Sequence, residues 1–86
     1  MKIVNGKNYL SVDEGSKILG VTYKTFRKYL KLGKIRRRTE GGWETKKINI
    51  EMITFPSSGF RYCNAEQVED LAAEFYPGYI RQFSPR

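Results

Sequence analysis

Three segments of the chain place apolar residues at helical spacing, and each begins at a residue that caps helices. In the first, Ser11 precedes the segment 12–19 and Glu14 stands three residues after it, which is the capping-box arrangement. Gly20 follows the segment, and its missing Cβ suits the left-handed residue that ends many helices. A helix over 12–19 is therefore predicted.

The second and third helices are predicted in the same way. Thr22 is a favourable N-cap for a helix that runs to about Leu32, where Gly33 ends it. Asn64 opens the third helix, whose apolar residues recur at i, i+3, i+4 and i+7: Val68, Leu71, Ala72 and Phe75. Pro77-Gly78 ends that helix.

Between the second and third helices the pattern changes to the two-residue alternation of strands. The segment 34–39 leads into Glu40-Gly41-Gly42, which predicts a hairpin turn. A return strand is expected over 43–55, where isoleucines and a methionine alternate with polar residues between 48 and 52. A second turn at 56–59 and a short strand at 60–63 complete this part.

The two N-terminal helices are joined by Gly20 and Val21 alone, and so short a connection predicts a helix-turn-helix unit. Ser16 is the small residue expected where the helices cross, and Phe26 is expected to face the first helix near Leu19 and Val21. With the basic hairpin as a wing, the predicted fold class is mainly α with a β-wing (α+β). It is a winged helix-turn-helix of three helices plus a β-hairpin or small antiparallel sheet. Its expected extent is 1–76, followed by an aromatic C-terminal tail over 77–86.

The charge of the chain limits the kinds of ligand that it is expected to bind. The chain has 16 basic and 9 acidic residues, a net charge of +7, which favours a polyanion and nucleic acid first. Ten of the bases lie between 22 and 47, beside two acids. The candidate DNA-binding residues belong to the second helix and the wing: Thr22, Tyr23, Lys24, Arg27, Lys28, Lys31, Arg36, Arg37, Arg38, Lys46 and Lys47.

The two basic segments are expected to act differently. The start of the second helix would meet base edges in the major groove, where Arg27 suits bidentate contact with guanine or phosphate. Arg36 and Arg38 share one face of a strand, and Arg37 takes the other. A wing of this kind would lie along phosphates or in the minor groove.

The segment 9–35, YLSVDEGSKILGVTYKTFRKYLKLGKI, resembles the DNA-binding unit of the MerR-like and phage excisionase families. The matching positions are Asp13-Glu14, Ile18-Leu19-Gly20-Val21, Thr22, Thr25-Phe26-Arg27 and Gly33-Lys34-Ile35. With GFRYCNAEQVEDLA at 59–72, which is similar to the return strand and next helix of those families, the resemblance covers about 9–75. The segment 40–58 is longer than their usual wing, and the long coiled coil of full MerR regulators is missing.

The resemblance implies a small sequence-specific protein that binds double-stranded DNA. Its expected role is an excisionase-like recombination directionality factor or a small transcriptional regulator of a phage or mobile element. The expected partners besides DNA are a second copy, as a homodimer or a cooperative array, and an integrase or another protein. The alternatives left open are an RNA-binding module and a phage protein–protein adaptor that acts on host machinery.

The sequence gives little support for catalysis, metal binding or a disulfide. There is no histidine and Cys63 is the sole cysteine, so the chain alone cannot form a disulfide or a His/Cys zinc site. We expect no catalytic residue, no metal and no cofactor. No apolar run approaches the roughly 20 residues of a membrane span, and a cytoplasmic location is expected. Cys63 is expected to fill the core, Trp43 to be a structural aromatic, and the tail aromatics to cover the core, with self-association as the alternative.

Overall fold

The computed structural model describes residues 1–83. Its elements in chain order are β1 (Lys2–Val4), β2 (Lys7–Ser11), α1 (Val12–Leu19), α2 (Tyr23–Leu32), β3 (Lys34–Thr39), β4 (Gly42–Lys47), β5 (Met52–Thr54), β6 (Arg61–Asn64) and α3 (Ala65–Phe75). The predicted helices are confirmed, and their bounds agree with the predicted ones to within a residue or so.

The strands form two antiparallel sheets, a curled four-stranded sheet in the order β1-β2-β6-β5 and the separate β3–β4 hairpin. Strand accounts for 33% of the structure and helix for 35%. The predicted mainly α winged helix-turn-helix fold with one hairpin or small sheet is therefore wrong. The fold is α+β, because residues at the N-terminus and before α3 build a second and larger sheet.

The missing part of the prediction is the β1–β2 hairpin. Its strands pair with Val4 opposite Lys7, so the turn consists of Asn5 and Gly6. Both have positive φ, 51° and 76°, as a tight primed turn requires, and Asn-Gly is the commonest pair for it. This turn signal was present in the sequence, although the flanking residues 2–4 and 7–11 do not alternate between polar and apolar positions.

The strand predicted over 43–55 is divided in two. The chain leaves the hairpin after Lys47, and the Ile48 amide donates a hydrogen bond to the Gly33 carbonyl (3.0 Å). Ile48 and Ile50 then pack against the core before β5 pairs with β6. The alternation of residues 48–52 thus belongs to a connection that crosses from one sheet to the other, because core contacts can recur every second residue in any extended chain.

The helix ends confirm the capping signals. Ser11 Oγ accepts from the Glu14 amide (3.1 Å), and the Glu14 carboxylate accepts from the Ser11 amide (2.9 Å). The side chains of Thr22 and Asn64 cap α2 and α3 by accepting from the amides of Thr25 and Gln67. Gly20, which follows α1, lies in the left-handed region at φ 70°. These contacts satisfy amides that a helix start leaves without partners.

Helix α1 packs against the Phe26 ring of α2 at Gly15. A Cβ at this position would lie 2.5 Å from Phe26 Cε2, so a larger residue would displace the ring. The expected crossing residue, Ser16, is instead buried with its hydroxyl donated to the Asp13 carbonyl (2.7 Å). The crossing depends on the glycine because only hydrogen leaves room for the aromatic ring.

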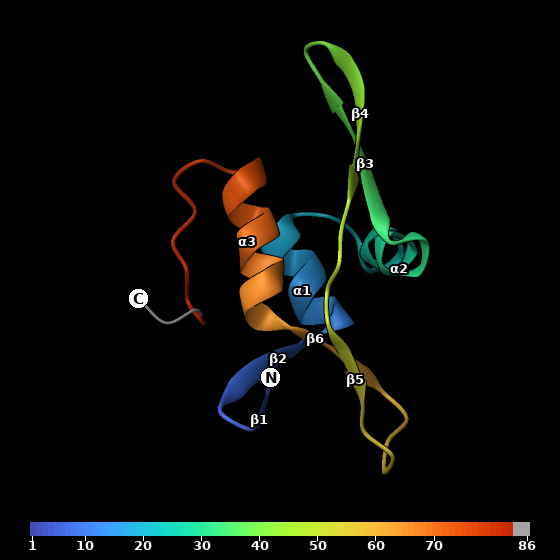
Figure 1. Cartoon of the computed structure of the whole chain (residues 1–86), viewed down its shortest axis with the longest axis vertical. Helices are drawn as coiled ribbons and strands as arrows, with labels where there is room; N and C mark the ends of the chain where they lie inside the picture. The colour runs from blue at the N-terminus through green and yellow to red at the C-terminus, as the bar shows by residue number, and fades with distance from the viewer. Residues whose placement is uncertain (84–86) are drawn as a thin grey trace.

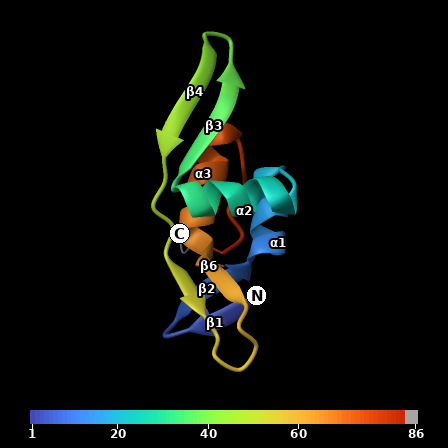
Figure 2. The same ribbon diagram turned by 90° about the vertical axis from the view of Figure 1, so that its right-hand side faces the viewer.

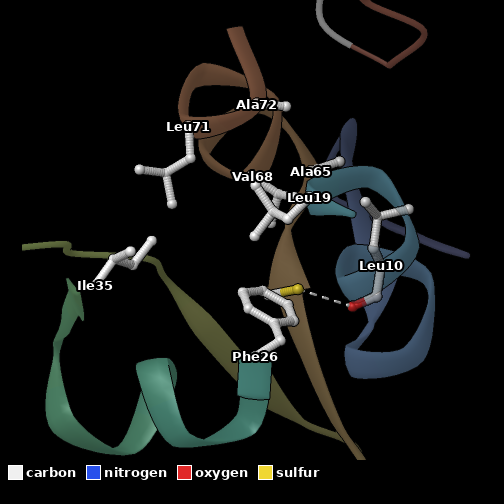
Figure 3. Close-up of a cluster of buried hydrophobic side chains, with 9 residues drawn as sticks. Leu10, Leu19, Phe26, Ile35, Ala65, Val68, Leu71 and Ala72 are labelled. Atoms are coloured by element: carbon white, nitrogen blue, oxygen red, sulfur yellow. Dashed lines mark hydrogen bonds between the residues drawn. The ribbon is translucent and has the colours of Figure 1, made fainter. Parts of the chain in front are cut away.

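Phe26 reaches the centre of the core, where it is fully buried beside Cys63 and residues of α1 and α3 (Figure 3). Cys63 donates a hydrogen bond through Sγ to the Leu10 carbonyl (3.3 Å), and burial raises the pKa of its thiol to about 12. A thiol with so high a pKa is unreactive at neutral pH. The interpretation of Cys63 as a core filler is confirmed.

The segment after α3 folds back over that helix (Figure 1). Tyr76 donates its hydroxyl to the Leu19 carbonyl (2.6 Å). The fully buried Glu69 accepts from the Tyr79 hydroxyl (2.9 Å) and from the backbone amides of Gln82 (2.6 Å) and Phe83 (3.0 Å). The expectation that the tail covers the core is confirmed for Tyr79 and Phe83, which pack against it, but it is wrong for Ile80, which is 73% exposed. Positions 84–86 of the predicted tail lie outside the described residues.

The molecule is elongated, with principal extents of 44, 29 and 18 Å. The β3–β4 hairpin projects from one end and the β5–β6 connection from the other, and α2 lies across one side between them (Figures 1 and 2). None of the helices within residues 1–83 has the length and apolar character that crossing a membrane requires.

Candidate nucleic-acid interface

The bases of α2 lie on the half of the helix that points away from the core. Phe26 is buried, and at about 100° per residue the three lysines fall opposite it while Arg27 lies on the flank of the helix. All four are exposed, and within residues 1–83 none of them forms an ion pair: Lys24, Arg27, Lys28 and Lys31. A helix with no acid of its own therefore presents an uncompensated positive stripe.

The two residues predicted at the start of α2 differ in their availability. The Thr22 hydroxyl accepts from the Thr25 amide (3.2 Å) and donates to Thr25 Oγ1 (2.9 Å), so it is occupied by the helix cap. Tyr23 is 48% exposed at the first turn. Tyr23 is thus free to contact a ligand, whereas the role of Thr22 in this structure is to begin the helix.

The register of the hairpin divides its side chains between two faces. Arg36 pairs with Thr45, Arg37 with Glu44 and Arg38 with Trp43, and paired residues share a face. We call one side the groove face, which consists of Lys34, Arg36, Arg38, Trp43, Thr45 and Lys47. The other, the α3 face, consists of Ile35, Arg37, Thr39, Gly42, Glu44 and Lys46.

The bases of the α3 face have partners within the protein. The Arg37 guanidinium lies over the Phe75 ring at 4.3 Å and within 3.8 Å of Glu44. Lys46 forms an ion pair with Glu74 of α3. Two of the predicted DNA-binding residues, Arg37 and Lys46, are therefore held against α3, where they orient the hairpin.

The groove face carries four bases and no acid, and its side chains are exposed. Lys34 stands directly opposite Lys47 across the strands, an arrangement of like charges that destabilises a hairpin. Within residues 1–83, no ion pair involves a base of this face. The repulsion would be relieved by a bound anion.

Trp43 was expected to be a structural aromatic, yet it packs on no part of the core. It is 63% exposed, and its ring contact is with the Arg36 guanidinium at 4.9 Å from the centroid. Trp43 and Lys34 were both missing from the predicted site. Lys34 could have been predicted, because in a strand it lies on the same side as Arg36 and Arg38. The position of Trp43 could not, because it depends on which residues of β3 and β4 pair.

Between α2 and the groove face lies an open groove of about 780 Å³. Thr25, Lys28, Tyr29 and Leu32 form the helix side, and Lys34, Arg36, Trp43 and Thr45 form the hairpin side. The Tyr29 hydroxyl donates to the Arg36 carbonyl (3.4 Å) and so connects the two walls. Figure 2 shows α2 and the hairpin on the same side of the molecule.

Comparison with known proteins gave no match to a family model, a curated protein or a solved structure. In the part of the chain that the structure describes, no group of three or more acidic, cysteine or histidine residues could hold a metal ion.

Proposed function

We propose that this protein binds double-stranded DNA, with α2 in the major groove and the β3–β4 hairpin against the backbone or minor groove. Such proteins gain most of their affinity from the neutralisation of phosphates by Lys and Arg. A helix and a two-stranded ribbon are the elements that fit the grooves of B-DNA.

The observation that carries this proposal is the unequal pairing of charge. On the α3 face, acids meet bases: Glu44 lies beside Arg37, and Glu74 beside Lys46. The groove face and the outer side of α2 hold eight bases without an acid among them, which are Lys24, Arg27, Lys28, Lys31, Lys34, Arg36, Arg38 and Lys47. A solvated charged surface would mix both signs, whereas a polyanion site needs one.

Within this proposal, the biological role is that of an excisionase-like recombination directionality factor or a small transcriptional regulator of a phage or mobile element. The resemblance of the segment 9–35 to those families supports it, together with the short turn between α1 and α2. A surface this small offers few specific contacts, so binding as a homodimer or as a cooperative array on repeated sites would raise affinity.

The test of the proposal is the dependence of binding on salt. If about five phosphates are neutralised, log affinity for duplex DNA should fall against log salt with a slope of about −4 to −5. Fluorescence anisotropy of a labelled duplex, measured from low to physiological salt, gives this slope. A flat response, or no binding to any duplex at low salt, would reject the proposal.

The bases of α2 are expected to determine sequence preference. Arg27→Ala or Lys24→Ala should lower discrimination between a selected site and random duplex by about 1–3 kcal/mol, because base-edge contacts differ between sequences. Affinities for both duplexes are measured side by side after selection of a preferred site from a random pool. Equal losses on the two duplexes would show that α2 contacts only phosphates.

A second candidate function, binding of single-stranded RNA, rests on the exposed Trp43. RNA-binding proteins stack unpaired bases on exposed aromatic rings, and one face of this ring is already supported by Arg36. Competition between duplex DNA and single-stranded RNA for the wild-type protein separates the two. A preference for the RNA, abolished by Trp43→Ala, would replace the proposal of duplex binding.

A further inference from the structure

We infer that the groove between α2 and the β3–β4 hairpin holds the sugar–phosphate backbone of one strand of the duplex. This inference rests on the proposed function and assigns it a specific subsite. The major and minor grooves of B-DNA are separated by one backbone strand. A protein that places α2 in one groove and the hairpin at the next must therefore accommodate that strand between them.

The chemistry of the groove suits a phosphodiester. Lys28 on the helix side and Lys34 and Arg36 on the hairpin side supply cations from both walls, and no acid lines it in the described chain. The hydroxyls of Thr25 and Thr45 can donate to phosphate oxygens, as Thr side chains commonly do in complexes with DNA. Cations on opposite walls can reach phosphates on successive nucleotides of a single strand.

Trp43 gives the groove an apolar surface as well. Its ring stands on the hairpin wall with the Arg36 guanidinium over one face. A deoxyribose can pack on an aromatic surface, and the indole N–H is a donor without an acceptor function. Trp43 would thus contact the sugar between two phosphates, which accounts for a large aromatic at an exposed position.

Contacts within the protein fix the position of the two walls of the groove. Tyr29 belongs to α2, and its hydroxyl bonds to the backbone of β3 at Arg36. On the far side of the hairpin, the contacts of Arg37 and Lys46 with α3 restrict its angle. The groove is therefore present before binding, so its width depends on contacts that DNA need not induce.

The test replaces single phosphates of a binding duplex by neutral methylphosphonates, one linkage at a time on each strand. We expect two or three adjacent linkages of one strand to be sensitive, each weakening wild-type binding about 10-fold. With Lys34→Ala, one of these linkages should cause little further loss, because the lysine that contacts its phosphate is already absent. Lys31→Ala, an exposed lysine of α2 outside the groove, is the matched control and should show full losses at those linkages.

Two results would overturn the inference. If every modified linkage weakens binding of Lys34→Ala as much as it weakens binding of the wild type, the groove does not hold the backbone. The proposal that the wild type binds duplex DNA would be unaffected by that result. If the wild type binds no duplex, the proposed function fails and this inference with it. The unmodified duplex with the wild-type protein distinguishes the two failures.

Discussion

Phe26→Ala is expected to lower the free energy of unfolding by about 3–5 kcal/mol, the usual effect of deleting a fully buried aromatic ring. The ring packs directly against Gly15, which has no side chain that could fill the cavity left by the ring. The cavity would lie between α1, α2 and β6, where three elements meet. A chain of this length has a stability of roughly 4–13 kcal/mol, so the variant would lose a large share of it.

The measurement is thermal unfolding by circular dichroism together with duplex binding. The melting temperature should fall by at least about 12 °C, since 1 kcal/mol corresponds to roughly 4–8 °C in a domain of this size. Lys28→Ala, two residues along α2 on its exposed side, is the control and should melt as the wild type does while binding DNA more weakly. If Phe26→Ala melts like the wild type, the packing of α2 described here is incorrect.

The double variant Arg36→Gln/Arg38→Gln is expected to weaken duplex binding at least about 100-fold at low salt. Each arginine lies on the groove face and forms no ion pair with an acid among residues 1–83, and a charge-assisted contact contributes roughly 1.5–3 kcal/mol. Random and selected duplexes should lose affinity alike, because backbone contacts carry no direct sequence information. The slope of log affinity against log salt should become shallower by about 1.8, as expected for two phosphates.

The matched control for this variant is Lys7→Gln/Lys17→Gln, which removes the same charge from β2 and α1. Both lysines are exposed and lie outside the groove and the hairpin. Its affinity should fall only by the general effect of lower net charge, and its salt slope should stay that of the wild type. If the two double variants lose affinity equally, binding depends on net charge and the hairpin has no special part in it.

Local sequence signals were sufficient for the helices. Ser11, Thr22 and Asn64 cap them, and Gly20 and Gly33 end the first two, through contacts that span no more than five residues. The hairpin turn at 40–41 and the gathering of bases between 22 and 47 could be predicted for the same reason. Caps, tight turns and clusters of charge depend on residues close together in the chain, so the sequence alone is enough to predict them.

The larger sheet could not be predicted in this way. Strand β2 pairs with β6 through Leu10 and Cys63, which lie more than fifty residues apart. Each of these strands is short, and the pairing of either depends on the core that α1 and α3 form beside it. The Asn5-Gly6 turn and the strand predicted at 60–63 had local signals, but no local signal shows that β2 and β6 pair. A mainly α fold was therefore expected and an α+β fold was found.

The sequence by itself determined the helices, their caps, the turn of the projecting hairpin and the positive charge of this protein. The tertiary structure decided which of the basic residues remain available. The alternation of β3 shows that Arg36 and Arg37 point to opposite sides, but not which side is covered. The position of α3 covers Arg37 and Lys46 with Phe75 and Glu74 and leaves Arg36 and Trp43 open to the groove beside α2. That choice depends on packing between segments distant in the chain, because a charge becomes available or paired only through the neighbours that the fold brings to it.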